Sequence, residues 1–285
     1  MGLKPPAYMA KSKEFIEKML LAIDIGNTQT VIGLYEGREL RHMWRIASSK
    51  TDTSDELRLK VAPLLASEGL GADAVTGAVL ASVVPSLGAA WRRALARSFE
   101  LEPVMCSAAA AGDLFDTTYS NPSEIGADRI ADAVAARALY GSPVVVVDFG
   151  TATNLEVIDA EGRFIGGIIA PGLETSAAAL FSHATKLPAI DLVDPGIAIG
   201  TNTVHAMQAG IVYGEADRVD GFVTRVFAEM GYEAPVVATG GGATTMASIC
   251  RTVTAVNPEL TLEGLRLVFE EQARLGAAAQ RGDVS

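Results

Sequence analysis

The sequence is poor in cysteine, histidine and positive charge. Its 285 residues include two cysteines and three histidines, and 34 acidic residues outnumber 23 basic ones, so the net charge is −11. Cys106 and Cys250 follow no CxxC or zinc-ligand spacing, and we expect both to pack as small hydrophobic residues. The histidines are scattered along the chain and suggest no metal cluster. Because nucleic-acid backbones and anionic membranes attract basic surfaces, this acidic protein is predicted to bind neither.

Long apolar runs are also missing. No stretch reaches the ~18–20 apolar residues of a membrane-spanning helix. Charged residues interrupt Ala10–Lys18, so the apolar core of an export signal is absent there. Lys4-Pro5-Pro6 is a poor start for a folded element. We therefore expect residues 1–18 to be a disordered tail, with Met19 as an alternative start, and the protein to be soluble and cytoplasmic.

One turn occurs twice in the chain. The apolar segment Met19–Asp24 is followed by Gly26-Asn27-Thr28-Gln29-Thr30, and Val144–Asp148 is followed by Gly150-Thr151-Ala152-Thr153-Asn154. The two aspartates lie 148 − 24 = 124 positions apart, close to the length of one domain. Each copy continues into another apolar run, which is the pattern of a duplicated β-hairpin. Two such turns facing each other across a cleft would hold the phosphates of a nucleotide.

The residue types of this turn suit phosphate binding. Glycine lets the backbone approach a phosphate closely, and exposed N–H groups and threonine hydroxyls donate hydrogen bonds to it. An aspartate beside a phosphate makes sense with a cation between them, commonly Mg²⁺ with several waters. Alone, each Asp-x-Gly could be only a tight hairpin turn. The duplication and a third turn, Thr239-Gly240-Gly241-Gly242-Ala243, favour the phosphate site.

Helices and strands alternate after each duplicated hairpin. Thr53 and Glu56 form a capping-box signature for a helix that runs through Leu65. Further elements are predicted as helices at Trp91–Phe99, Ile130–Leu139, Thr175–Phe181, Thr203–Phe227 and Leu262–Leu275, and as strands at Met43–Ala47, Ala74–Val83, Glu102–Cys106, Leu155–Ile158, Ile165–Ile169 and Pro235–Ala238. This order predicts an α/β protein with two mixed-sheet domains, residues 19–140 and 141–276, beside a cleft. Residues 277–285 are expected to form a disordered C-terminal tail.

The order of the motifs resembles a known superfamily. The turns after Asp24 and Asp148 and the third, glycine-rich turn are similar to the two phosphate motifs and the adenosine motif of the actin/hexokinase/Hsp70 ATPases. Between them, Tyr119–Arg129 resembles the signature of type III pantothenate kinases, with Gly126-Ala127-Asp128-Arg129 at its core. The resemblance covers Met19–Leu275. It implies duplicated ribonuclease-H-like (actin-like ATPase) domains with mixed β-sheets and an interdomain nucleotide cleft.

The resemblance also implies a reaction and its residues. Members phosphorylate the primary hydroxyl of pantothenate with ATP, the first step towards coenzyme A. The matching ATP-binding positions are Asp24, Ile25, Gly26, Asn27, Thr28, Gln29, Thr30, Val31, Thr151, Gly240 and Gly241. The matching pantothenate-binding positions are Tyr119, Gly126, Ala127, Asp128, Arg129 and Thr203. Asp24 would lie near Mg²⁺ and Asp148 would bind a monovalent cation, K⁺ or NH₄⁺. The pantothenate pocket of the family lies at a dimer interface, which implies a homodimer.

Asp128 is the expected general base. A primary alcohol loses its proton as it attacks phosphorus, and a positioned carboxylate can accept that proton. The start of a helix and the neighbouring Arg129 would keep this carboxylate ionised, and Arg129 offers a two-pronged donor for the carboxylate of pantothenate. Taken alone, Asp128 is better explained as an N-terminal helix residue paired with Arg129, and it is the surrounding motif that favours catalysis. Asp132, one turn later, could be a second cation ligand or an exposed helix residue, and we expect the latter.

The sequence leaves two other functions open. A polyphosphate or nucleotide phosphatase of the same superfamily would not need the segment Tyr119–Arg129. A non-catalytic regulator, a transcriptional accessory homologue, would be expected to lack Asp24 or Asp128, and both are present. Thr201 stands where members of the family often have lysine, a departure that removes no residue needed for catalysis.

Overall fold

The described strands form two mixed sheets. The structure is a computed structural model that describes residues 19–183 and 187–281, so the predicted tail at residues 1–18 lies outside it. The first sheet has the order β3-β2-β1-β4-β5 and the second has the order β11-β10-β7-β8-β9-β6. The strands are β1 (Met19–Ile25), β2 (Gln29–Glu36), β3 (Glu39–Ala47), β4 (Val75–Ser82), β5 (Val104–Met105), β6 (Asp116–Thr117), β7 (Val144–Phe149), β8 (Ala152–Ile158), β9 (Arg163–Pro171), β10 (Val236–Thr239) and β11 (Ala255–Val256).

The duplicated hairpin predicted from the sequence is confirmed. β1 pairs antiparallel with β2 and parallel with β4, and β7 pairs antiparallel with β8 and parallel with β10. The two strands therefore occupy equivalent central positions in their sheets. Asp24 lies near the carboxyl end of β1 and Asp148 near the carboxyl end of β7. Ligands of open α/β sheets bind at such strand ends.

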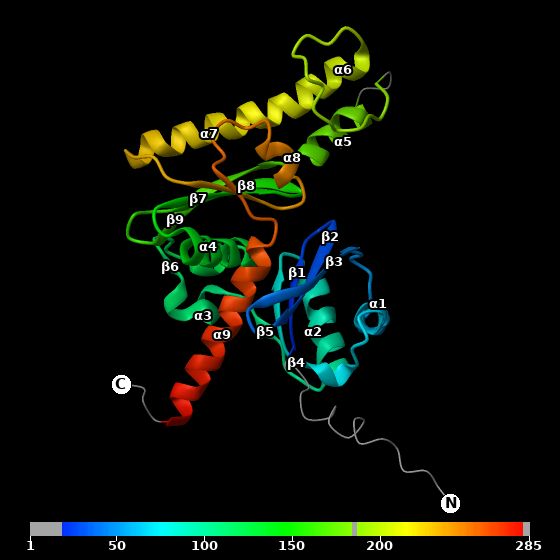
Figure 1. Ribbon diagram of the computed structural model, residues 1–285, viewed down its shortest axis with the longest axis vertical. Helices are drawn as coiled ribbons and strands as arrows, with labels where there is room; N and C mark the ends of the chain where they lie inside the picture. The colour runs from blue at the N-terminus through cyan, green and yellow to red at the C-terminus, as the bar shows by residue number, and fades with distance from the viewer. Residues whose placement is uncertain (1–18, 184–186, 282–285) are drawn as a thin grey trace, which may run out of the picture.

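Helices separate the two sheets and cover their outer faces (Figure 1). On the first sheet, α1 (Ser54–Ser67) and α2 (Pro85–Phe99) pack on one face, and α4 (Ala127–Tyr140) and α9 (Leu260–Arg281) pack on the other. The same helix α4 packs on the second sheet, whose opposite face carries α7 (Gly214–Met230) and α8 (Ala243–Ala247). The remaining helices are α3 (Ala108–Ala111), α5 (Leu173–His183) and α6 (Thr203–Gln208). The apolar faces of α4 and of the N-terminal half of α9 are thus buried between the two sheets, while the C-terminal part of α9 is exposed.

Local signals explain where several elements begin. Thr53 and Glu56 form the predicted capping box of α1: the Thr53 N–H donates to Glu56 Oε2 at 2.7 Å, and the Glu56 N–H donates to Thr53 Oγ1 at 3.3 Å. Both cysteine thiols are free and buried, as expected. α4 begins at Ala127, three residues before the predicted start, so Asp128 lies in its first turn. No helix in residues 19–183 and 187–281 is long and apolar enough to cross a membrane.

Two further expectations about helices are wrong. The single helix expected at Thr203–Phe227 is divided into α6 and α7 by a π-helical turn at Ala209–Tyr213. The predicted disordered tail is helical as far as Arg281, because α9 continues through a stretch rich in alanine, the strongest helix former. Residues 282–285 of that tail lie outside the described residues.

Candidate active site

The two predicted phosphate turns meet. A hydrogen bond of 2.9 Å joins Thr28 Oγ1, in the β1–β2 turn, to Thr151 Oγ1, in the β7–β8 turn. Each turn is closed by its own backbone bond, from the Gly26 N–H to the Gln29 carbonyl and from the Gly150 N–H to the Ala152 carbonyl, both at 3.0 Å. These backbone bonds are typical of tight hairpin turns. Two unrelated hairpins in separate sheets would not need to face each other, whereas a shared phosphate site would require it.

The predicted ATP-binding residues of the first turn differ in exposure. The side chains of Asn27, Thr28 and Gln29 are exposed at the tip of the turn, as Thr151 is in the second turn. Ile25 and Thr30 are buried in the first sheet, so they can offer a ligand only backbone groups. A phosphate between the turns would therefore meet mostly backbone N–H groups and threonine hydroxyls, which are neutral donors.

The third turn lies against the second. β10 pairs with β7 so that Thr239 lies opposite Asp148, and the Gly242 N–H donates to the Phe149 carbonyl at 3.0 Å. Gly240 has φ +87°, and a methyl group there would collide with Asp148 Oδ1. Glycine is therefore required at this position both for its backbone conformation and for space. The predicted adenosine turn and the predicted cation ligand thus share one corner of the site.

Asp128 lies in the first turn of α4, beside both sheets. Its Oδ1 accepts a hydrogen bond of 2.8 Å from the Arg129 N–H. Burial nevertheless raises the pKa of Asp128 above its usual value, because desolvation outweighs that hydrogen bond and the charge of Arg129. The Arg129 N–H and the Arg129 charge do favour the ionised form, as the sequence predicts, but burial opposes them because the helix is enclosed by packing that the sequence does not reveal.

A group of carboxylates surrounds Asp128. Burial raises the pKa of Asp24 well above its usual value, and the charges of Asp128 and Asp148 raise it further. Burial and Asp128 likewise raise the pKa of Asp148 to about 7, while Arg45 lowers it. Carboxylates that raise the pKa of one another repel when all are ionised, and this repulsion is unfavourable unless a bound cation or protons offset it. No three acidic, histidine or cysteine side chains of the described residues are arranged to hold a metal ion unaided.

Asp132 corrects one of the expectations from the sequence. It is 1% exposed, not a surface residue, because this part of α4 is packed between the two sheets and α9. Burial raises its pKa well above the usual value, and its Oδ1 has no hydrogen-bond partner within the described residues. Its sequence neighbours Ala131 and Ala133 indicated this burial, since the turns of a helix that face solvent are seldom so apolar.

Arg129 faces inward, to residues that sequence reasoning missed. Its Nε donates to Glu156 Oε1 at 3.0 Å and its Nη2 to the Leu155 carbonyl at 3.4 Å. Its guanidinium carbon lies 5.2 Å from the centre of the Phe164 ring, and the Tyr119 ring meets the same ring edge-on at 5.5 Å. The structure therefore brings Tyr119 and Arg129 together through Phe164. Glu156, an acidic residue in an otherwise apolar part of β8, was the one visible signal.

Sequence comparisons identify the family. The model of the family described as type III pantothenate kinase matches residues 20–225. A type III pantothenate kinase of Moorella thermoacetica is 45% identical over 252 residues, which cover 88% of this chain and 99% of that protein. One of Frankia casuarinae is 46% identical over 253 residues, which cover 89% of this chain and 99% of that protein.

The chain belongs to the type III pantothenate kinase family.

Solved structures support the fold of this family member. A crystal structure of a putative Baf family transcriptional activator from Campylobacter jejuni has a TM-score of 0.55 at 18% identity and covers 89% of this chain and 99% of that one. The ROK hexokinase of Thermus thermophilus has a TM-score of 0.50 at 14% identity and covers 90% and 100%. At these identities the likeness establishes the actin-like ATPase fold and nothing about activity.

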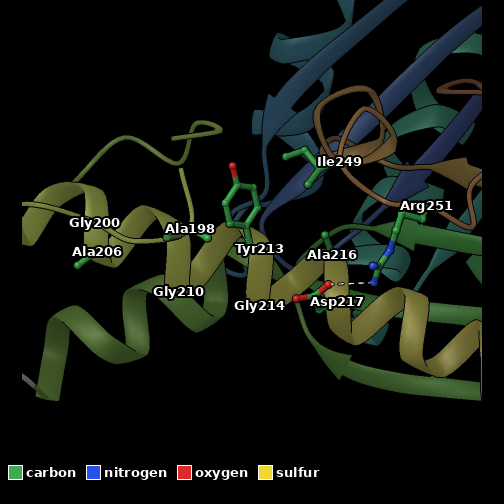
Figure 2. A pocket seen from close by; sticks show the side chains of 11 residues that line it. Ala198, Gly200, Ala206, Gly210, Tyr213, Gly214, Ala216, Asp217, Ile249 and Arg251 are labelled. Carbon is green, nitrogen blue, oxygen red and sulfur yellow. Dashed lines mark hydrogen bonds and ion pairs between the residues drawn. The ribbon is translucent and has the colours of Figure 1, made fainter. Parts of the chain in front are cut away.

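One predicted site residue of this kinase-family chain lies apart from the others. Thr203 is exposed at the start of α6, and Figure 1 shows α6 beyond the end of α7, on the outer side of the second sheet. Tyr119 packs on the inner side of that sheet, with α4. A separate hollow of about 610 Å³ lies beside the π-helical turn and α7. Tyr213, Asp217, Ile249 and Arg251 line it together with alanines and glycines, as Figure 2 shows. None of the predicted site residues lines that hollow.

Proposed function

We propose that this protein transfers the γ-phosphoryl group of ATP to the primary hydroxyl of pantothenate and forms 4′-phosphopantothenate, the first step of coenzyme A synthesis. The meeting of two equivalent Asp-Gly turns through Thr28 and Thr151 is the observation that carries this proposal. The activity named for relatives at about 45% identity over nearly their whole length supports the substrate. Domains of residues 19–140 and 141–276 would then meet at the nucleotide.

The first partner of this site is ATP. Its phosphates would lie on the residues from Asp24 to Val31 and on Thr151, with the adenosine beside Gly240 and Gly241. The exposed hydroxyls of the two turns support this placement. Pantothenate would contact Tyr119, Asp128 and Arg129, together with the backbone at Gly126 and Ala127 and with Thr203.

Asp128 is the proposed general base. As the hydroxyl oxygen of pantothenate forms its bond to the γ-phosphorus, its proton passes to the Asp128 carboxylate, and the bond to the β,γ-bridging oxygen breaks to release ADP. The raised pKa of Asp128 supports this role, because a base is most effective when its pKa approaches the working pH. The proton then leaves with solvent when the product dissociates.

The clustered carboxylates suit bound cations. Asp24 would hold Mg²⁺ through water, and Asp148 would bind K⁺ or NH₄⁺. Burial, and after it the charge of Asp128, raises the pKa of both residues, and this supports the assignments because a bound cation would stabilise the two carboxylates in their ionised form. Mg²⁺ bound with ATP offsets the charge of the phosphates during transfer.

A homodimer is proposed as the working unit, in the cytoplasm. Large apolar side chains are exposed around α5, α6 and the segment between them, namely Leu180, Val193, Ile197, Ile199 and Val204. Ile199 is 87% exposed, which is costly unless another surface covers it. Thr203 begins α6 inside this patch and is remote from Tyr119 in the same chain, so it would reach the pantothenate of the partner subunit.

The test is a coupled assay of the purified protein with ATP, Mg²⁺, K⁺ and pantothenate, with mass spectrometry of the product. We expect ADP release that depends on pantothenate and a product heavier by one phosphoryl group. ADP release without pantothenate would instead indicate a phosphatase. An absence of phosphopantothenate under these conditions would refute the proposed function.

A further inference from the structure

The Arg129 guanidinium is held on several sides by buried groups. Glu156, which is 0% exposed, accepts from Nε at 3.0 Å, and the Leu155 carbonyl accepts from Nη2 at 3.4 Å. A side chain at Gly167, on β9, would collide with Nη2 and with the Leu155 carbonyl, so the guanidinium occupies the space over that glycine. The ring of Phe164 lies 5.2 Å from the guanidinium carbon. These contacts hold the Arg129 guanidinium in one orientation.

We propose that Glu156 and Phe164 are positioning residues that aim Arg129 at the carboxylate of pantothenate. The proposal rests on the proposed function and adds two residues to it. Neither residue needs to touch the substrate: Glu156 fixes the inner edge of the guanidinium, and Phe164 supports its plane. The contacts described within residues 19–183 and 187–281 use Nε and Nη2, so Nη1 is the donor that remains for a ligand.

The buried ion pair is difficult to explain by stability alone. Taking two charges out of water costs several kcal/mol per ion, and well-packed apolar residues often stabilise a fold equally well. Glu156 Oε2 has no hydrogen-bond partner within the described residues, so one of the two carboxylate oxygens is buried without a compensating hydrogen bond. A role in orienting the Arg129 guanidinium would explain why a glutamate is present at this buried position.

Phe164 links Arg129 to Tyr119, another residue predicted to bind pantothenate. The Tyr119 ring meets its edge at 5.5 Å while Arg129 lies over its face. The backbone is fixed there as well, because Thr117 Oγ1 donates to the Phe164 carbonyl at 2.8 Å and accepts from the Tyr119 N–H at 3.1 Å. A shift of Phe164 would therefore move both side chains together.

The test compares pantothenate with pantothenyl alcohol, which keeps the reacting hydroxyl and has a hydroxymethyl group in place of the carboxylate. For Glu156→Gln we expect KM for pantothenate to rise by about 10–100-fold, the value of one hydrogen bond to a charged group. KM for pantothenyl alcohol and for ATP should change by less than about threefold, since neither uses the Arg129–carboxylate contact. Phe164→Leu, which keeps an apolar core side chain, should shift pantothenate KM in the same direction. Glu161→Gln, the same change at an exposed pair with Arg163, is the matched control.

Several results would overturn the inference. An equal rise in KM for both substrates would indicate a general structural defect in Glu156→Gln. If Glu156→Gln does not fold, Phe164→Leu decides instead. An unchanged KM for pantothenate in Phe164→Leu would refute the inference. A wild type that uses both substrates with equal KM would refute carboxylate recognition while the proposed function stands. A wild type that phosphorylates neither substrate would refute the proposed function, and this inference with it.

Discussion

Replacing Gly240 with alanine tests how the third turn supports the site. Gly240 has φ +87°, a conformation that costs an L-residue ~1–2 kcal/mol. The added methyl group would also lie 2.7 Å from the Phe149 carbonyl oxygen and collide with Asp148 Oδ1. Overpacking of this kind costs ~1–3 kcal/mol. We therefore expect Gly240→Ala to lower the free energy of unfolding by roughly 2–5 kcal/mol, the sum of these two ranges.

The neighbouring glycine provides a matched control. Gly241 is exposed, its φ is not positive, and a methyl group there would have no atom within 4 Å. Gly241→Ala should change the free energy of unfolding by less than about 1 kcal/mol, because it introduces neither strain nor collision. Both substitutions reduce the conformational entropy of the unfolded chain by a similar amount, so this effect cancels when the free energies of unfolding of the two variants are compared.

Unfolding in guanidinium chloride and ATP titration would measure these effects. Gly240→Ala should show a lower midpoint with an unchanged slope and a weaker response to K⁺, because its methyl group displaces the Asp148 carboxylate. Gly241→Ala should keep the midpoint and raise KM for ATP if the turn receives the adenosine. Equal midpoints for the two variants would refute the strain and collision ascribed to Gly240.

Four further predictions concern the proposed chemistry and the proposed dimer. Asp128→Asn should lower kcat by roughly 10²–10⁴ with ATP affinity retained; full turnover would return Asp128 to a structural role. Because burial raises the pKa of Asp128, and the base works only when deprotonated, kcat/KM should already fall while the pH is still above ~4, the usual range of an aspartate. Activity should rise with K⁺ or NH₄⁺ but not Na⁺, and Asp148→Ala should abolish that response; equal rates in all three salts would count against the assignment. Mixing Tyr119→Ala with Thr203→Ala protein should restore up to about a quarter of wild-type activity, since half of the dimers are mixed and one of their two pockets is intact; no rescue, with a wild type that sediments as a monomer, would refute a shared site.

Local chemistry allowed much of the fold to be predicted. The two Asp-Gly turns, the capping box of α1 and the central strands each depend on residues adjacent in sequence, so the pattern alone identifies them. Asp128 was predicted to lie at the start of this helix, and it lies in the first turn of α4, which begins three residues before the predicted start. The catalytic and binding roles assigned from the family resemblance stay predictions.

The C-terminal helix shows the limit of composition. Its alanine-, glycine- and glutamine-containing end suggested disorder, yet α9 continues to Arg281. Alanine favours helix wherever a preceding helix has already formed, because adding a residue to an existing helix needs no new nucleus. The π-helical turn at Ala209–Tyr213 had no local signal either.

The sequence by itself determined which residues could carry phosphate and proton chemistry: an aspartate and a glycine at each strand end, and Asp128 at a helix start. Tertiary structure decided the environment of those residues. The burial of Asp132 and the pairing of Arg129 with Glu156 arise because α4 is enclosed between two sheets, and the enclosing residues come from distant parts of the chain. Burial, and with it the direction of a pKa shift, is a property of that packing, so no short segment of the sequence contains it.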